Sequence, residues 1–339
     1  MAVKIRDFEI GPGNPLCVIA GPCQIESHTH ALMMANALKR MCAEAGVNFV
    51  YKSSFDKANR TSIGTKRGLG ASEGLEILNE VRRYVDVPVL TDIHLPQHAM
   101  LCKQYNVDVI QIPAFLSRQT DLLVAAGETG LPINIKKGQF MAPDDIGRAA
   151  EKIASTGNDQ ILLCERGVTH GYNNLVVDMR SLDILSQKES PVFIDCTHSV
   201  QSPGGNGVSS GGNRYMAPVI ARAAVAVGVA GVGRQYRRPV GRRPPARWCS
   251  ACPRTRSRST SASAACAGTT ALPRQLSRST RWATPLATRP TSGSDSHQLP
   301  LVNSTGGPPA PGIPSLALPC NPCFAALATF LGAPSTEAT

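Results

Sequence analysis

The last third of the chain lacks two kinds of residue that the rest uses freely. It has no lysine after Lys188, and its only acidic residues after position 233 are Asp295 and Glu337. Residues 234–339 nevertheless hold 13 arginines and 15 of the 26 prolines, whereas residues 1–233 carry no net charge. The formal charge of +11 therefore belongs entirely to the tail and says nothing about the partners of the first two thirds.

Long hydrophobic runs are missing as well. No apolar run approaches the roughly 18 residues that a membrane span needs, and Met1–Glu9 mixes four charged residues into the place of a signal peptide. The eleven cysteines are scattered, and several lie inside apolar runs, which is typical of a reducing compartment rather than a disulfide framework. We therefore expect a cytoplasmic protein without membrane partners.

Continuously apolar runs alternate with helical patterns through residues 1–233. Such runs are typical of parallel strands covered on both faces. Seven are present, Leu16–Ile19, Phe49–Tyr51, Val87–Leu90, Val109–Ile112, Pro132–Ile135, Ile161–Cys164 and Val192–Ile194, and an eighth begins near Gly231. The alternation predicts an α/β fold, a (β/α)8 TIM barrel. A doubly wound sheet is the alternative, although Ala20–Cys23 after the first strand is not the glycine fingerprint of dinucleotide sites.

The helices between these runs are predicted from apolar residues at helical spacing. Ser27 is a suitable N-cap for a helix over His28–Ala45, and Pro143 opens another helix that ends before Gly157. The remaining helical patterns are Leu75–Val85, His98–Tyr105, Thr120–Gly127 and Met216–Val227.

Polar side chains gather where the predicted strands end. A barrel carries its chemistry at the carboxyl ends of its strands, and at least four cations would meet there, which indicates a substrate with more than one phosphate or carboxylate group. A solvated turn is the alternative for the cationic stretch Lys52–Ser62. The strand-end residues are Cys23, Lys52, Ser54, Lys57, Asn59, Arg60, Asp92, His94, Gln111, Arg118, Lys136, Lys137, Glu165, Arg166, Asp195 and His198.

Six motifs resemble the 3-deoxy-D-manno-octulosonate 8-phosphate synthase family, and the resemblance covers residues 8–232. The motifs are Lys52–Arg60, Gln111–Asp121, Asn134–Phe140, Glu165–Gly167, Gly171–Asp178 and Asp195–Gln201. The related 3-deoxy-heptulosonate 7-phosphate synthase, which uses erythrose 4-phosphate, is the alternative within enzymes. It carries Lys-Pro-Arg-Thr where this chain has Lys57-Ala-Asn-Arg60.

The resemblance implies a substrate pair and a role for each strand-end residue. The family condenses phosphoenolpyruvate with arabinose 5-phosphate and water, releasing phosphate, in lipopolysaccharide precursor synthesis, and forms homotetramers. The phosphoenolpyruvate residues would be Lys52, Ser54, Lys57, Gln111, Lys136 and Arg166. The arabinose 5-phosphate residues would be Asn59, Arg60 and Thr61, with Arg118 supplied by a neighbouring subunit. The catalytic residues would be Asp92, Lys57, His198 and Asn59.

A divalent metal is a further implication of the resemblance. Cys23 within Gly21–Ser27 is similar to the metal-dependent members, which implies Cys23 and His198 as ligands of Zn, Fe, Mn or a similar ion. Two further family ligands, a Glu and an Asp, align without gaps to Gln235 and Ala246. Two of the four ligands are therefore missing.

The tail interrupts the resemblance after Val232. We predict that residues 1–233 form a (β/α)8-type synthase domain without a normal eighth strand or final helix, because prolines and buried arginines after Gly233 disfavour a closing strand. The composition of residues 234–339 predicts a disordered tail, or one translated out of frame. An open barrel with half of its metal ligands predicts poor activity.

A different class of function is the alternative: an inactive remnant whose basic tail associates with nucleic acid by counterion release. No aromatic platform accompanies the arginines, so nucleic acid is not the favoured partner.

The nucleotide sequence across codons 225–250 tests the tail hypothesis. We expect a shifted reading frame to encode Phe-Met-Glu or Phe-Ile-Glu directly after the codon for Val232. If no frame near this point encodes that strand, the tail belongs to the gene as written and the frameshift hypothesis is wrong.

Overall fold

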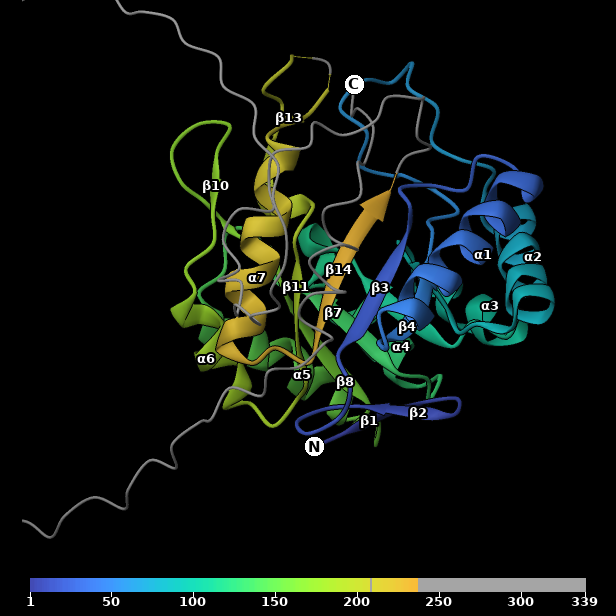
Figure 1. Ribbon diagram of the computed structural model, residues 1–339, viewed down its shortest axis with the longest axis horizontal. Helices are drawn as coiled ribbons and strands as arrows, with labels where there is room; N and C mark the ends of the chain where they lie inside the picture. The colour runs from blue at the N-terminus through green and yellow to red at the C-terminus, as the bar shows by residue number, and fades with distance from the viewer. Residues whose placement is uncertain (208, 237–339) are drawn as a thin grey trace, which may run out of the picture. The chain divides into compact units, whose positions relative to one another are not determined.

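Eight parallel strands form a closed barrel in the computed structural model, which describes residues 1–207 and 209–236. Their order around the barrel is β11-β14-β3-β4-β5-β6-β7-β8 (Figure 1). The strands are β3 (Cys17–Pro22), β4 (Asn48–Lys52), β5 (Val89–Asp92), β6 (Val109–Ile112), β7 (Ile133–Lys136), β8 (Ile161–Glu165), β11 (Val192–Asp195) and β14 (Gly231–Tyr236). The predicted (β/α)8 architecture is confirmed.

One helix follows each of the first seven barrel strands. They are α1 (His28–Glu44), α2 (Ala71–Val81), α3 (Gln97–Gln104), α4 (Thr120–Gly127), α5 (Ile146–Ala154), α6 (Arg180–Ser186) and α7 (Ala217–Val227). The Ser27 hydroxyl accepts a hydrogen bond from the backbone N–H of His30 at 3.2 Å, so the predicted N-cap is confirmed. The sequence pattern did not predict α6, because seven residues are too few to show a helical period.

The core has two layers. The residues that point into the barrel are Cys17, Ile19, Val50, Leu90, Val109, Leu162, Cys164 and Phe193, and a larger cluster fills the space between strands and helices. A hairpin of β1 (Val3–Ile5) and β2 (Phe8–Ile10) lies at the N-terminal ends of the strands (Figure 1). It packs Val3, Ile5 and Ile10 against the inner layer. The hairpin covers that end, so the carboxyl ends remain for a site.

Short hairpins extend two loops at the carboxyl ends, β9 (Val168–Thr169) with β10 (Leu175–Val176) and β12 (Gln201–Ser202) with β13 (Gly211–Gly212).

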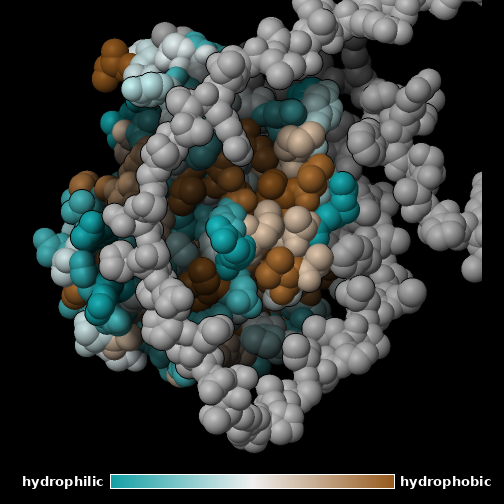
Figure 2. Space-filling model, turned by 90° about the vertical axis from the view of Figure 1, so that its left-hand side faces the viewer, coloured by the Kyte–Doolittle hydropathy of each residue, from teal (hydrophilic) through white to brown (hydrophobic). Residues whose placement is uncertain are grey.

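Figure 2 shows the side of the barrel that carries α6 and α7, where hydrophobic surface lies beside polar surface. α7 has one charged residue, Arg222, and Val219 and Val227 are exposed. No helix among the described residues is long and apolar enough to cross a membrane.

The eighth strand forms, which corrects the prediction of a barrel that cannot close. β14 pairs with β3 over Gly231–Tyr236 and with β11 over Gly231–Gly233. Closure needs main-chain hydrogen bonds rather than an apolar sequence. The Arg234 guanidinium is accommodated 5.0 Å from the centre of the Tyr236 ring, and the first proline comes after the strand. The predicted loss of the final helix and the tail predictions fall on residues 237–339, outside the described residues.

Two glycines of β14 provide a matched test of this strand. A Cβ on Gly231 would lie 2.1 Å from the Phe193 ring and 2.5 Å from the Cys17 carbonyl oxygen, whereas a Cβ on Gly233 would meet nothing nearer than 3.6 Å. We expect Gly231→Ala to lower the free energy of unfolding by about 2–3 kcal/mol through overpacking. Gly233→Ala should raise it by about 0.5–1 kcal/mol, because alanine loses less backbone entropy.

Urea denaturation of the full chain measures both changes. Equal effects of the two substitutions would contradict the position of β14 between β3 and β11.

Candidate active site

Asp92 is the centre of one charged cluster at the barrel mouth. It ends β5 and is buried, and its carboxylate lies 3.1 Å from the Lys52 ammonium and 3.9 Å from that of Lys57. The Ser54 hydroxyl donates to the same carboxylate, and the Nε2 atom of His94 lies 3.3 Å from it. Residues from β4, the loop after it and β5 thus meet around one anion, as strand-end placement predicts.

The three charges in this cluster titrate differently. Burial lowers the pKa of Lys52 to about 8, with Lys57 adding to the effect and Asp92 opposing it. Burial also opposes the charge on Lys57, yet Asp92 keeps the pKa of Lys57 above its ordinary value. The pKa of Asp92 lies well below its usual range, because the two lysines outweigh its burial. Lys52 is therefore the cation whose charge changes closest to neutral pH.

A second cluster joins β7 to β11. The Lys136 ammonium pairs with the Asp195 carboxylate, which also bonds His198 Nδ1 at 2.6 Å. Burial, together with the charge of Lys136, lowers the pKa of His198 to about 4, although Asp195 opposes this. The imidazole is therefore neutral near pH 7. Because Asp195 accepts a hydrogen bond from Nδ1, the lone pair is on Nε2.

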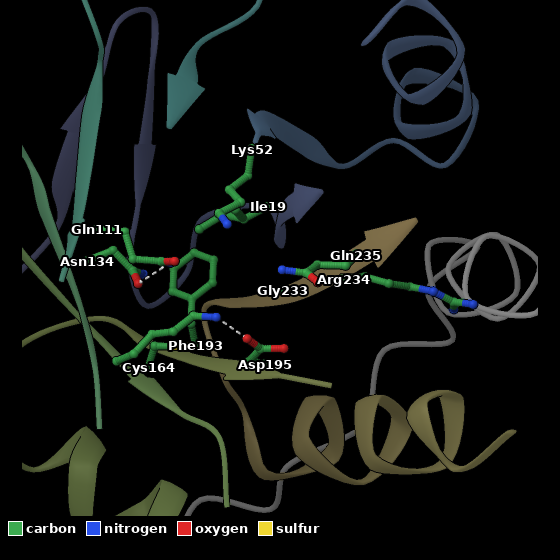
Figure 3. Close-up of a pocket in the computed structure, with 11 residues that line it drawn as sticks. Ile19, Lys52, Gln111, Asn134, Cys164, Phe193, Asp195, Gly233, Arg234 and Gln235 are labelled. Carbon is green, nitrogen blue, oxygen red and sulfur yellow. Dashed lines mark hydrogen bonds and ion pairs between the residues drawn. The ribbon is translucent and has the colours of Figure 1, made fainter. Parts of the chain in front are cut away.

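One cavity lies between the two clusters. The polar side chains that line it are those of Lys52, Gln111, Asn134, Lys136, Asp195 and Gln235, and Figure 3 shows the cavity. Gln111 Nε2 donates to Asn134 Oδ1 at 3.1 Å. Asn134 was not among the predicted site residues, although an amide inside the apolar run Pro132–Ile135 was a signal. In Figure 3 the side-chain amide of Gln235 points toward the cavity, and the Arg234 side chain points away from it.

Arg166 and Lys137 both follow buried strands but have different surroundings. Arg166 is 6% exposed, and its Nη1 atom has no hydrogen-bond partner among the described residues. A buried guanidinium nitrogen without a partner is costly, so it suits a bound anion. Lys137 is fully buried, lies 3.4 Å from the Glu165 carboxylate and donates to the Met141 carbonyl oxygen at 3.0 Å. Lys137 therefore supports the structure of the strand ends.

The remaining predicted residues lie outside the cavity lining. The Arg60 guanidinium donates to the Gln24 side-chain carbonyl, while Asn59 and Thr61 are exposed on the same loop. Arg118 is exposed after a 3-10 turn at Ala114–Leu116. Among residues 1–207 and 209–236, these three exposed residues form no hydrogen bond or ion pair with the Asp92 cluster.

The two predicted metal ligands come from different strand ends. Cys23 directly follows β3 and is half-buried, and His198 follows β11. No group of three His, Cys, Asp or Glu side chains within residues 1–207 and 209–236 could hold a metal ion. Structural and catalytic zinc sites use at least three protein ligands. The residues present therefore do not fit a closed metal site, and metal dependence stays a prediction.

A closed parallel barrel defines an enzyme-type site for small, multiply charged anions when its carboxyl end carries buried lysines and an arginine nitrogen that has no partner in the described part of the chain. The chain belongs to the DAHP synthetase I family, whose model matches residues 1–233.

Proteins named 2-dehydro-3-deoxyphosphooctonate aldolase are similar to this chain. One from Granulibacter bethesdensis is 55% identical over 232 residues, which is 68% of this chain and 81% of the relative. One from Bartonella tribocorum is 51% identical over 230 residues, or 68% of this chain and 82% of the relative. One from Caulobacter vibrioides is 55% identical over 221 residues, which is 65% of this chain and 77% of the relative.

The pKa of Lys52 predicts how binding of phosphoenolpyruvate, the anion that the resemblance implies, would depend on pH. Lys52 carries its charge below pH 8 and loses it above, so the KM for this anion should rise by roughly tenfold per pH unit beyond 8. Lys52→Arg keeps its charge at all these pH values, so its KM should stay nearly constant between pH 7 and 9.5. Steady-state kinetics measures KM against pH for both proteins. The same rise of KM with pH in both would contradict the assignment of this pH dependence to Lys52.

Proposed function

We propose that this chain condenses phosphoenolpyruvate with D-arabinose 5-phosphate and water, giving 3-deoxy-D-manno-octulosonate 8-phosphate and inorganic phosphate. The observation that carries the proposal is the 51–55% identity to proteins named 2-dehydro-3-deoxyphosphooctonate aldolase, over 221–232 residues. The buried cations at the barrel mouth support it independently, because both substrates are phosphorylated anions. The product would be a lipopolysaccharide precursor, and residues 1–233 would carry the activity.

The phosphoenolpyruvate subsite is proposed at the cavity between the two clusters. Lys52 and Lys136 line it, and the Gln111 amide is held in place by Asn134. Arg166 and Lys57 would add two charges, and Ser54 a hydroxyl. These groups are fixed by the ends of several different strands, so they offer charge stabilisation without having to reorganise.

The proposed reaction forms one carbon–carbon bond and one carbon–oxygen bond, and it breaks the carbon–oxygen bond to the phosphate. The methylene carbon of phosphoenolpyruvate attacks the sugar aldehyde, whose oxygen takes up a proton. Water adds to the carbon that carries the phosphate, and one of its protons is the one that the sugar oxygen takes up. The other proton leaves with the phosphate as that carbon becomes a ketone. The protein's task is to hold the enol carbon against the aldehyde while the anionic groups stay neutralised.

Asp92 and His198 have distinct proposed roles in this scheme. Asp92 is ionised and holds Lys52, Lys57 and Ser54 in one arrangement, so it keeps the donors near the reacting carbons. His198 is neutral with a lone pair on Nε2, so it can accept a hydrogen bond from the attacking water. Asn59 would contact the sugar as the aldehyde approaches.

The sugar phosphate is proposed to bind at the loop that carries Asn59, Arg60 and Thr61. Arg118 would come from a neighbouring subunit of a homotetramer, because it is exposed in this chain beside Phe115, which is 55% exposed. Arginine and aromatic residues are enriched in the cores of protein interfaces.

Three alternative functions are a heptulosonate synthase, an inactive remnant and a protein that associates with nucleic acid. The family matched here is described by the name of the heptulosonate synthase, but the similar proteins given above are octulosonate aldolases. The inactive remnant was predicted from an open barrel, and the barrel is closed. Association with nucleic acid would rest on residues 237–339, outside the described residues.

Phosphate release by the purified 339-residue chain tests the proposal. We expect release with phosphoenolpyruvate and arabinose 5-phosphate, and far less with erythrose 4-phosphate in place of the pentose. Arg166→Ala should reduce kcat/KM by about 10- to 100-fold, since it removes charged hydrogen bonds to the substrate.

Arg180→Ala is the matched control, because the Arg180 side chain is 87% exposed and pairs with Asp178 at the surface. It should leave kcat/KM unchanged. Equal rates with the two sugars, or equal losses in the two arginine variants, would overturn the proposal.

A further inference from the structure

The acidic residue nearest to His198 is already fully engaged. Asp195 Oδ1 accepts the backbone N–H groups of Thr197 and His198, at 3.2 and 2.9 Å. Its Oδ2 accepts from His198 Nδ1 at 2.6 Å and pairs with Lys136. A carboxylate with four donors around it has little capacity left to bind a metal ion.

β14 places an amide, rather than a carboxylate, beside this group. The backbone N–H of Gln235 donates to the Thr197 hydroxyl at 3.0 Å, and that of Cys196 donates to the Gly233 carbonyl oxygen at 3.0 Å. These bonds fix β14 against the segment that carries His198. Gln235 is then the residue whose side chain reaches the cavity, while Arg234 points away (Figure 3). Amide oxygens are ligands for hard ions such as calcium, not for the thiol- and imidazole-binding metals.

Positive charge already occupies this side of the cavity. The Lys136 ammonium lies 3.4 Å from His198 Nδ1 and lines the same cavity as Lys52 and Gln235. A divalent cation between Cys23 and His198 would have to enter among these ammonium groups with two protein donors. Like charges at such distances repel strongly out of water.

We propose that this chain works without a resident divalent cation, and that the Lys136 ammonium supplies the fixed positive charge beside His198. The residue that decides this is Gln235: a carboxylate at its position would add the third donor that Cys23 and His198 lack. The inference rests on the proposed function for its chemistry, but its test does not need activity.

Metal content and cobalt titration of the full chain provide that test. The purified protein, dialysed in metal-free buffer, should hold far less than one metal ion per chain by mass spectrometry. Titration with Co(II) alone, followed by the thiolate-to-cobalt absorption band, should show weak binding. Gln235→Glu should bind Co(II) at least about tenfold more tightly, and adding Cys23→Ser to it should remove the band.

Gln235→Leu is the matched control, because it removes the amide without adding a donor, and it should bind Co(II) as weakly as the unsubstituted chain. Circular dichroism checks that each variant folds. If Gln235→Glu does not fold, the metal content of the unsubstituted chain decides whether a resident metal ion is present. About one tightly held ion per chain that Cys23→Ser removes would overturn the inference, as would a Gln235→Glu affinity equal to that of Gln235→Leu.

Phosphate release in the presence of a chelator separates the inference from the proposed function. Turnover that persists in chelator supports both, and turnover that appears only after metal is added overturns the inference alone. A chain that never releases phosphate overturns the proposed function, and the metal content still decides the inference.

Discussion

Positive charge held out of water is the constraint that governs this barrel. Three strand ends supply the cations at one mouth: Lys52 and Lys57 come from the end of β4 and the loop after it, Lys136 from β7, and Arg166 from the residue after β8, and Lys52 and Arg166 are buried. Two carboxylates, Asp92 and Asp195, offset part of that charge and fix the lysines in place. Within residues 1–207 and 209–236 the Nη1 atom of Arg166 has no hydrogen-bond partner, which indicates that the offset is incomplete. An anionic substrate completes it, so binding and orientation follow from the same electrostatics.

The barrel wall matters to this arrangement because Asp195 and Gln235 belong to the neighbouring strands β11 and β14. Main-chain hydrogen bonds close the wall at β14, although its sequence, Gly231–Tyr236, carries an arginine and a glutamine. The inward side of this strand has Gly231, Gly233 and Gln235, which are small or polar. The strand thus lines the cavity with Gly233 and the Gln235 amide and adds no carboxylate to it.

The sequence predicted the fold well where local patterns are strong. All seven complete strand predictions, from Leu16–Ile19 to Val192–Ile194, overlap observed strands. Short, continuously apolar runs between turn residues are typical of buried parallel strands. The β1–β2 hairpin and α6 were not predicted, since they are too short to show a period. The prediction that the eighth strand does not form was wrong, because the strand ends at Tyr236, before the first proline, and its arginine packs against the Tyr236 ring.

The site was predictable only in part. Strand-end placement brought Lys52, Ser54, Lys57 and Asp92 together correctly, since parallel strands end on one side of a barrel. It could not distinguish Lys136, which lines the cavity, from Lys137, which is fully buried against Glu165. Neighbouring residues on a strand point to opposite faces, and the strand's register decides which one faces inward. The supporting roles of Asn134 and Gln24 depend on contacts between strands, which spacing along the chain does not reveal.

The most direct measurement is thermal unfolding of the full chain with and without phosphoenolpyruvate. If the mouth holds unneutralised buried charge, phosphoenolpyruvate should raise the unfolding midpoint, corresponding to about 2.7 kcal/mol at a concentration 100 times its Kd. A neutral compound of similar size, such as glycerol at the same concentration, should leave the midpoint unchanged. An unchanged midpoint with saturating phosphoenolpyruvate, or an equal rise with glycerol, would contradict the claim that clustered cations bind the substrate.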